Sequence, residues 1–131
     1  MKTKYLYPAV FCREDVGYSV SFPDIDCCFT SGETLEEAID MAKDALCLML
    51  YDMEESKQSI PEPSDITTIQ CNENEFTSFI ECDTMEYRKF FNNKAIKKTL
   101  SIPAWLNTMA EREEINFSAV LQNALKAELG V

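Results

Sequence analysis

The sequence predicts an α+β fold in two parts, and three observations support this prediction. Short alternating runs of apolar and polar residues within the first 30 positions are typical of antiparallel β-strands. A long apolar stripe at helical spacing follows over residues 35–54. After residue 93 the pattern starts again, with one short strand followed by two short helices. A chain of 131 residues fits one ordinary domain or two small ones, and the restart favours two.

The first part contains the strands of a small sheet. Strands are expected over residues 4–11, 17–22, 27–30 and 76–82. Gly17 and the acidic residues before it are typical of a hairpin between the first two strands. Pro23 ends the second strand, because proline cannot donate a hydrogen bond to a neighbouring strand. The polar segment 54–65 holds two prolines and predicts a loop before the last strand.

The segment after the third strand predicts one long helix with a well-defined start. Thr34 and Glu37 form a capping box, in which the Thr34 hydroxyl accepts a backbone hydrogen bond and Glu37 reaches back. Apolar side chains then recur at helical spacing over about five turns. They are Leu35, Ala38, Ile39, Ala42, Ala45, Leu46, Met49, Leu50 and Met53. We expect this face, including its methionines, to form core rather than a binding groove.

The last part of the chain predicts a strand followed by two helices. Residues 96–102 alternate in polarity, which places Leu100 and Ile102 on one face of a strand. Pro103 ends this strand and suits the first turn of a helix. Ser118 is the expected N-cap of the second helix, and Gly130 its C-cap. The opposite face of the strand carries Lys97, Thr99 and Ser101.

Charge is divided unevenly between the two parts. Residues 1–93 contain 7 Lys or Arg against 19 Asp or Glu, whereas residues 94–131 contain 5 against 4. The acidic part suits a basic partner and repels nucleic acid, while the tail can approach a phosphate backbone. We therefore expect one domain over residues 1–84, a linker over 85–93 that can include a short helical turn, and a second domain over 94–131.

Several classes of function are disfavoured by residues that the chain lacks. Histidine is absent, which removes the commonest general base and the commonest zinc ligand. The six cysteines form no C-x-x-C pair, so we expect scattered free thiols, several of them buried. Asp24 and Asp26 are expected to form a turn rather than a metal site. The sequence has no long apolar stretch or leader pattern, so we expect a soluble, cytoplasmic protein that is not an enzyme and holds no metal or cofactor.

The strand–helix–helix pattern over residues 96–129 resembles the ribbon-helix-helix family of DNA-binding proteins. One copy of about 35 residues cannot bury a sufficient core, but two copies can do so by pairing their strands. The resemblance implies a homodimer whose paired ribbon enters the major groove, with the start of the second helix at phosphate. Carried over by position, the DNA-binding residues are Lys97, Thr99, Ser101, Asn116, Phe117 and Ser118. Lys98 lies on the inward side at the start of the strand, and we expect it to turn toward phosphate. Taken alone, Lys97 and Lys98 would better suit the solvated edge of a strand, and the two helices that follow favour DNA binding.

A longer motif lies in the first part of the chain. Phe22-Pro23-Asp24 is followed by the stretch CFTSGETLEEA over residues 28–38 and then by the long helix. This order resembles HicB-type antitoxins, although Asp26-Cys27 stands where that family more often has Pro-Gly. Over residues 3–90 the resemblance implies a partial RNase H-like fold. It also implies a partner, the HicA toxin, which is small, basic and cleaves mRNA.

The two resemblances together imply an antitoxin that neutralises its toxin and represses its own operon by binding operator DNA. The acidic residues expected at the toxin are Asp24, Asp26 and Glu33. An alternative is a stand-alone ribbon-helix-helix regulator whose first domain senses a ligand or another protein. A small, basic open reading frame beside the gene would favour the antitoxin over this alternative.

Overall fold

The computed structural model describes residues 2–131, which form two compact units. The first unit ends at Lys94 and the second begins at Ala95. The first unit contains β1 (Lys4–Arg13), β2 (Tyr18–Ser21), β3 (Phe29–Gly32), α1 (Leu35–Glu55), the 3-10 turn η1 (Ile66–Thr68), β4 (Glu75–Asp83) and α2 (Thr84–Phe91). The second unit contains α3 (Ala104–Arg112) and α4 (Phe117–Leu129).

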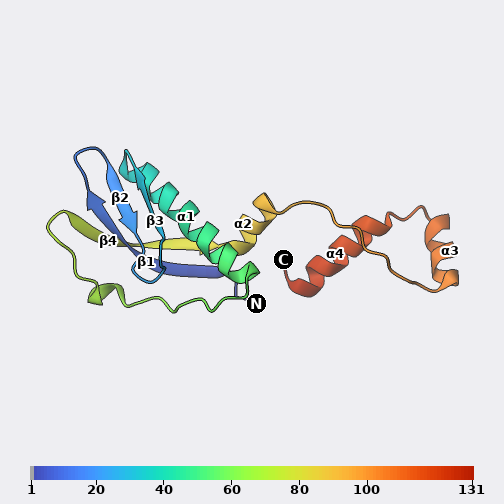
Figure 1. The fold of residues 1–131 in the computed structure, drawn as a ribbon. Helices are drawn as coiled ribbons and strands as arrows, with labels where there is room; N and C mark the ends of the chain where they lie inside the picture. Colours follow the sequence, from blue (N-terminus) through green and yellow to red (C-terminus); the bar gives the residue numbers. More distant parts are fainter. Residues whose placement is uncertain (1) are drawn as a thin grey trace. The chain divides into compact units, whose positions relative to one another are not determined.

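The first unit is a two-layer structure in which α1 lies across one face of a sheet (Figure 1). The four strands are antiparallel, in the order β3-β2-β1-β4. The predicted α+β class and all four predicted strands of this part are thus confirmed. The hairpin between β1 and β2 is confirmed as well, with the Glu14 N–H donating to the Gly17 carbonyl at 3.0 Å.

The third strand begins two residues later than the sequence predicted. Residues 22–28 form a turn instead, closed by a hydrogen bond from the Phe22 N–H to the Cys28 carbonyl at 3.1 Å. Ile25 at the centre of this turn is buried in the core. Burial of that side chain holds the chain in a turn where local pattern alone indicated an earlier strand.

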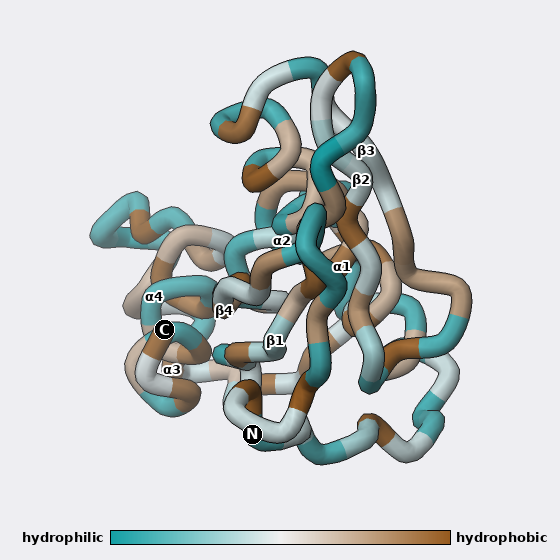
Figure 2. Tube along the Cα trace, turned by 90° about the vertical axis from the view of Figure 1, so that its left-hand side faces the viewer, coloured by the Kyte–Doolittle hydropathy of each residue, from teal (hydrophilic) through white to brown (hydrophobic). Residues whose placement is uncertain are grey.

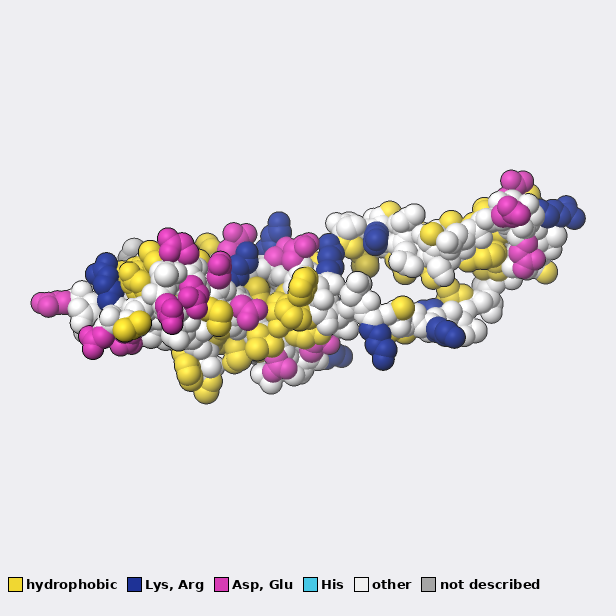
Figure 3. Space-filling view, turned by 90° about the horizontal axis from the view of Figure 1, so that it is seen from above, with side chains coloured by type: hydrophobic (Ala, Val, Ile, Leu, Met, Phe, Trp, Pro, Cys, Tyr) yellow, Lys and Arg dark blue, Asp and Glu magenta, His cyan; other side chains and the backbone are white. Residues whose placement is uncertain are grey.

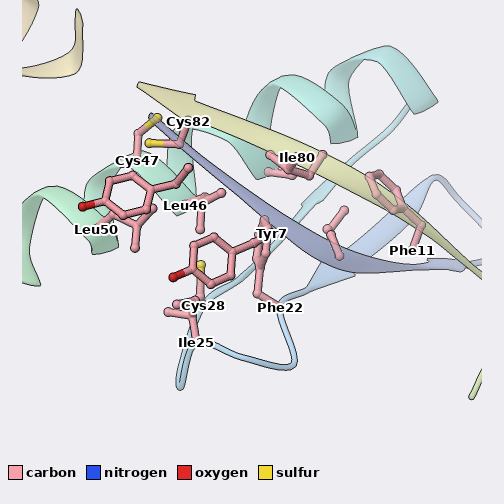
Figure 4. Close-up of a cluster of buried hydrophobic side chains, with 14 of the residues drawn as sticks. Tyr7, Phe11, Phe22, Ile25, Cys28, Leu46, Cys47, Leu50, Ile80 and Cys82 are labelled. Carbon is pink, nitrogen blue, oxygen red and sulfur yellow. The ribbon is translucent and has the colours of Figure 1, made fainter. Parts of the chain in front are cut away.

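The core lies between α1 and the sheet face that carries the odd-numbered residues of β1 (Figure 4). Phe11 stacks on Phe76 of β4, with ring centroids 5.2 Å apart. From α1, Leu46 and Leu50 are fully buried. Burial of each such side chain contributes about 1.5–3 kcal/mol to folding. The buried members are Tyr5, Tyr7, Ala9, Phe11, Val20, Phe22, Ile25, Cys28, Ala38, Ala42, Leu46, Cys47, Leu50, Ile80 and Cys82.

The start of α1 confirms Thr34 as the N-cap, but Glu37 reaches back to Glu33 instead of to the Thr34 N–H that a capping box uses. The Thr34 hydroxyl accepts from the Glu37 N–H at 3.1 Å, and Glu37 reaches back to accept from the Glu33 N–H at 3.4 Å. Gly32 lets β3 approach the helix closely, because a Cβ there would lie 2.4 Å from the Ala38 nitrogen. The helix runs one residue beyond the predicted end. Most of the predicted apolar face is core, but Ile39 is exposed, because it lies outside the stripe that meets the sheet.

The segment expected as a linker over residues 85–93 is mostly helical and belongs to the first unit. Asp83 caps α2, accepting from the Met85 N–H at 3.0 Å. The helix α2 also packs against α1, with the Tyr87 and Tyr51 ring centroids 5.3 Å apart. This tertiary contact explains the difference, since a two-turn helix is marginal without packing.

A buried carboxylate joins the ends of α1 and α2. Glu54 of α1 accepts hydrogen bonds from the Tyr5 hydroxyl at 2.8 Å and the Thr84 hydroxyl at 2.9 Å. Its other oxygen pairs with Arg88 at 3.3 Å, and the Glu54 side chain is 8% exposed. Burial and the hydrogen bond to Glu54 raise the pKa of Tyr5. The hydrogen bonds compensate for removing the carboxylate from water.

The second unit has two helices and no strand. The strand predicted over residues 96–102 is not formed, because a strand needs a partner for its backbone groups and the single chain supplies none. No residue from 95 to 131 is buried. Hydrophobic and hydrophilic residues alternate along α3 and α4 (Figure 2). Trp105 of α3 and Leu125 of α4 are exposed, so each helix has apolar side chains that this unit alone does not cover.

The cap of α4 differs from the one predicted. Asn116, rather than Ser118, is the N-cap, and its side-chain oxygen accepts from the Ala119 N–H at 3.0 Å. Asn and Ser are about equally good caps, so composition alone did not separate them. Gly130 is confirmed as the C-terminal cap, in the left-handed region with φ of 72°.

Candidate protein and DNA interfaces

The outward face of α1 is strongly acidic. Its exposed carboxylates are Glu36, Glu37, Asp40, Asp44, Asp52 and Glu55. In the space-filling view, acidic side chains gather over the first unit (Figure 3). With Lys94 included, this unit carries 8 Lys or Arg against 19 Asp or Glu. Such a surface attracts a basic partner and speeds its association.

Asp24, one of the three expected toxin contacts, is occupied within the structure. Its carboxylate accepts from the Ser64 N–H at 3.0 Å and also from the Ser64 hydroxyl. Nearby, the Tyr7 hydroxyl donates to the Pro61 carbonyl. Burial first, and then the charges of Glu62 and Asp24, raise the pKa of Tyr7. Asp24 therefore fastens the loop after α1 to the turn after β2.

Asp26 and Glu33 have a different environment from Asp24. Both side chains belong to exposed residues, and they lie before and after β3, at opposite ends of that strand. The structure thus does not gather the three predicted residues into one cluster. Within residues 2–131, no group of three or more His, Cys, Asp or Glu side chains is placed to hold a metal ion.

A shallow groove lies beside the first half of β1. Its lining includes the charged residues Lys2, Lys4 and Glu81 and the apolar residues Leu6, Pro63 and Phe79. Leu6 and Phe79 are both 49% exposed, although they are large and apolar. Half-exposed apolar side chains beside charged ones are typical of a surface that binds another protein.

The extended segment before α3 carries the predicted base-contacting residues. Lys97, Thr99 and Ser101 are all exposed. Leu100 is 63% exposed and Trp105 is 65% exposed, although both are large and apolar. In a single chain this segment is not paired with a second strand, so the predicted base-contacting face is not formed.

The start of α4 lies at the residues predicted to bind phosphate. Asn116 is the N-cap, and the helix begins at Phe117 and continues through Ser118. The first backbone N–H groups of a helix point out of its N-terminus, where a phosphate can accept from them. The helix has 13 residues, so its dipole adds to this attraction.

A protein-family model described as "HicB_like antitoxin of bacterial toxin-antitoxin system" matches residues 7–124, a range that includes parts of both units. The chain belongs to the HicB-like antitoxin family. An uncharacterized 14.9 kDa protein of Haemophilus phage HP1 is 33% identical over 101 residues, which cover 77% of this chain and 75% of that protein. Antitoxin HicB 2 of Photorhabdus laumondii is 41% identical over 64 residues, 49% of this chain and 46% of that protein.

Solved structures extend this relation to the fold. One chain of a toxin–antitoxin complex from Streptococcus pneumoniae is 30% identical, with a TM-score of 0.63, covering 95% of this chain and 99% of that chain. A chain of the HicA3 and HicB3 toxin–antitoxin complex is 25% identical, with a TM-score of 0.52, covering 60% of this chain and 99% of that chain. Antitoxin HicB3, at 23% identity and a TM-score of 0.54, shares the fold over 95% of this chain.

The HicB-like turn after β2 tolerates the departure seen in the sequence. Cys27 has φ of 59°, in the left-handed region that favours glycine, and HicB-type antitoxins more often have Gly there. The turn still closes, because the Cys28 N–H donates to the Ile25 carbonyl at 3.4 Å. A left-handed conformation at a residue with a Cβ costs roughly 1–2 kcal/mol, and the burial of Ile25 compensates for it.

Two features of this HicB-like chain were missed by the sequence analysis. The groove beside β1 had a visible signal, since residues 4–11 carry apolar side chains on both faces of the predicted strand. The junction of Glu54 with Thr84 and Arg88 had none, because these residues are far apart along the chain. Among residues 2–131, no helix is long and apolar enough to span a membrane.

Proposed function

We propose that this chain is an antitoxin that neutralises a HicA-type toxin through its first unit and represses its own operon through its second unit. The observation that carries the proposal is the family match over residues 7–124, which includes most of both units. A family relation confined to the first unit would have supported toxin binding alone.

The charge of the first unit supports a basic toxin as its partner. A similar protein occurs in the solved HicA3 and HicB3 toxin–antitoxin complex. Attraction between opposite surface charges raises the association rate and is screened within about 8–10 Å at physiological ionic strength. Association with the toxin from the neighbouring gene should therefore slow markedly as salt is added.

Charge reversals test where the toxin binds. Asp26→Lys and Glu33→Lys should each slow association several-fold at low salt, since both residues are exposed. Asp52→Lys is a matched control, because it changes the net charge equally at an exposed position on α1. Equal effects of all three variants on the association rate would mean that only the overall charge matters and that the two predicted contacts are wrong.

A fragment tests which unit neutralises the toxin. Residues 1–94 should suffice, because they include α2 and its pairing with α1. A fragment of residues 1–84 lacks Arg88 and should be less stable. If the fragment 1–94 folds but leaves the toxin active, the assignment of toxin binding to the first unit fails.

The exposed apolar side chains of the second unit support a homodimer in which two copies of residues 96–102 pair as a ribbon. Lys97, Thr99 and Ser101 of each copy would then project toward the bases of operator DNA. Thr99→Ala should weaken the specific site by about 1–3 kcal/mol and spare non-specific binding. Lys98→Ala should weaken binding to every sequence, and the salt dependence should fall by about one unit for each phosphate that the protein no longer neutralises.

An operator titration across salt concentrations separates these outcomes. If Thr99→Ala and Lys97→Ala both keep wild-type discrimination between operator and random DNA, the strand does not read the sequence. Operator binding without any toxin partner in co-expression would instead favour a stand-alone regulator whose first unit senses another molecule.

A further inference from the structure

Two thiols from different elements meet in the core of the first unit. Cys47 comes from α1 and Cys82 from β4, and both are free. The close-up shows their sulfur atoms side by side (Figure 4). Cys82 is fully buried, whereas Cys47 is 6% exposed. The toxin and DNA interfaces proposed above use neither thiol.

The surroundings shift the pKa values of the two thiols in opposite directions. The hydrogen bond from Cys82 lowers the pKa of Cys47 against the opposing effect of burial, and the Lys43 charge lowers it further. The same hydrogen bond and burial raise the pKa of Cys82. Because the thiolate is the reactive form of cysteine, this difference favours Cys47 over Cys82 as the nucleophile.

A surface pocket leads to Cys47. It opens between α1, the end of β4 and α2, and its lining includes Lys43, Cys47, Asp83 and Tyr87. A small neutral oxidant can therefore reach Cys47 first, while Cys82 lies behind it. Cys28 provides a contrast, since it is buried without a thiol partner and burial raises its pKa to about 11.

We propose that Cys47 and Cys82 form an oxidisable dithiol, which hydrogen peroxide converts into a disulfide that fastens α1 to β4. The Cys47 sulfur attacks one peroxide oxygen, the O–O bond breaks, and a sulfenic acid and one water result. The Cys82 sulfur then attacks the Cys47 sulfur, the S–O bond breaks, and a second water leaves. The two thiols lose two electrons and two protons, and the peroxide is reduced to two waters.

The cross-link would join the helix layer to the sheet layer across the long loop between α1 and β4. A disulfide that closes such a loop restricts the unfolded chain and so stabilises the folded one. Oxidation would thereby make the first unit harder to unfold and harder for a protease to degrade.

The test uses the full chain with the other accessible thiols removed by Cys12→Ser, Cys27→Ser and Cys71→Ser. After treatment with hydrogen peroxide, the intact mass should fall by about 2 Da as two hydrogens are removed. Non-reducing peptide mapping should identify a Cys47–Cys82 cross-link that dithiothreitol reverses. The Tm of the oxidised chain should rise by at least about 5 °C.

Single substitutions in this background provide the controls. Cys47→Ser and Cys82→Ser should each abolish the mass decrease, whereas Cys28→Ser should keep it. Peptide mapping of the parent needs no substitution in the core, so a variant that fails to fold does not decide the outcome. Oxidation of Cys47 to sulfinic acid without a cross-link, a cross-link through Cys28, or no reaction under conditions that oxidise glutathione would each overturn the proposal.

Discussion

The first unit buries its apolar side chains within a single chain, whereas the second leaves its own in contact with solvent. In the first unit Tyr7, Phe11 and Leu46 are almost completely enclosed between α1 and the sheet. In the second, Leu100 and Trp105 remain largely exposed, and no residue from 95 to 131 is buried. One unit encloses a hydrophobic core, whereas the other leaves its apolar side chains uncovered.

The difference follows from what each length of chain can enclose. The first unit has a sheet wide enough to cover one face of a long helix, so each layer buries the apolar side of the other. The second unit has two short helices and an unpaired extended segment. A chain of this size buries too little surface to be stable alone, and association with a second copy is a common solution.

The largest expected effect comes from placing a charge in the predicted dimer core. Leu100→Asp should abolish both dimer formation and operator binding, because two carboxylates would be buried against each other. Light scattering and operator titration measure the two effects. Thr99→Asp is the matched control on the opposite face of the predicted strand, and it should keep the dimer while no longer binding DNA. If Leu100→Asp remains a dimer, Leu100 is not part of a core that two copies of the second unit share.

A core truncation in the first unit should have the next largest effect. Leu46→Ala should lower the free energy of unfolding by about 2–5 kcal/mol, because it leaves a cavity under α1. Leu125→Ala in α4 should have little effect on the single chain, since Leu125 is exposed there. Urea titrations at low and high protein concentration check both variants. A large concentration-independent destabilisation by Leu125→Ala would show that the second unit has a core of its own.

The junction between α1 and α2 should contribute less. Glu54→Gln should lower the free energy of unfolding by about 1–3 kcal/mol, since it removes a buried charge that is hydrogen-bonded to Tyr5, Thr84 and Arg88. Glu55→Gln should cost less than about 1 kcal/mol, because that partner of Arg88 is half exposed. Equal destabilisation by the two variants in thermal unfolding would indicate that burial of Glu54 is not the cause.

The smallest expected effect concerns the start of α4. Asn116→Ala should reduce the stability of that helix by about 0.5–2 kcal/mol, because it removes the cap on the Ala119 N–H. Ser118→Ala should change it little, since Ser118 lies inside the helix. Circular dichroism of the full chain during thermal unfolding compares the two. The reverse order of effects would restore Ser118 as the cap.

Features that depend on residues close together in the sequence were predicted, whereas features that depend on distant residues were not. The long helix and its cap at Thr34 were predicted, because residues three and four apart along the chain determine both. The motif over residues 22–38 also predicted the family to which the chain belongs. The contacts predicted at Asp24, Asp26 and Glu33 stay predictions, and the bond from Ser64 to Asp24 shows what a motif alone does not reveal.

The sequence alone predicted the features that depend on neighbouring positions. These are helix periodicity, strand alternation, turn residues and charge distribution. Three features could not be predicted from neighbouring positions. They are the start of β3, the inclusion of α2 in the first unit and the contact of Cys47 with Cys82. Each depends on which distant surfaces are buried against one another when helix and sheet pack. Burial free energy is non-directional, so only the assembled layers select these contacts among the many that the same side chains allow.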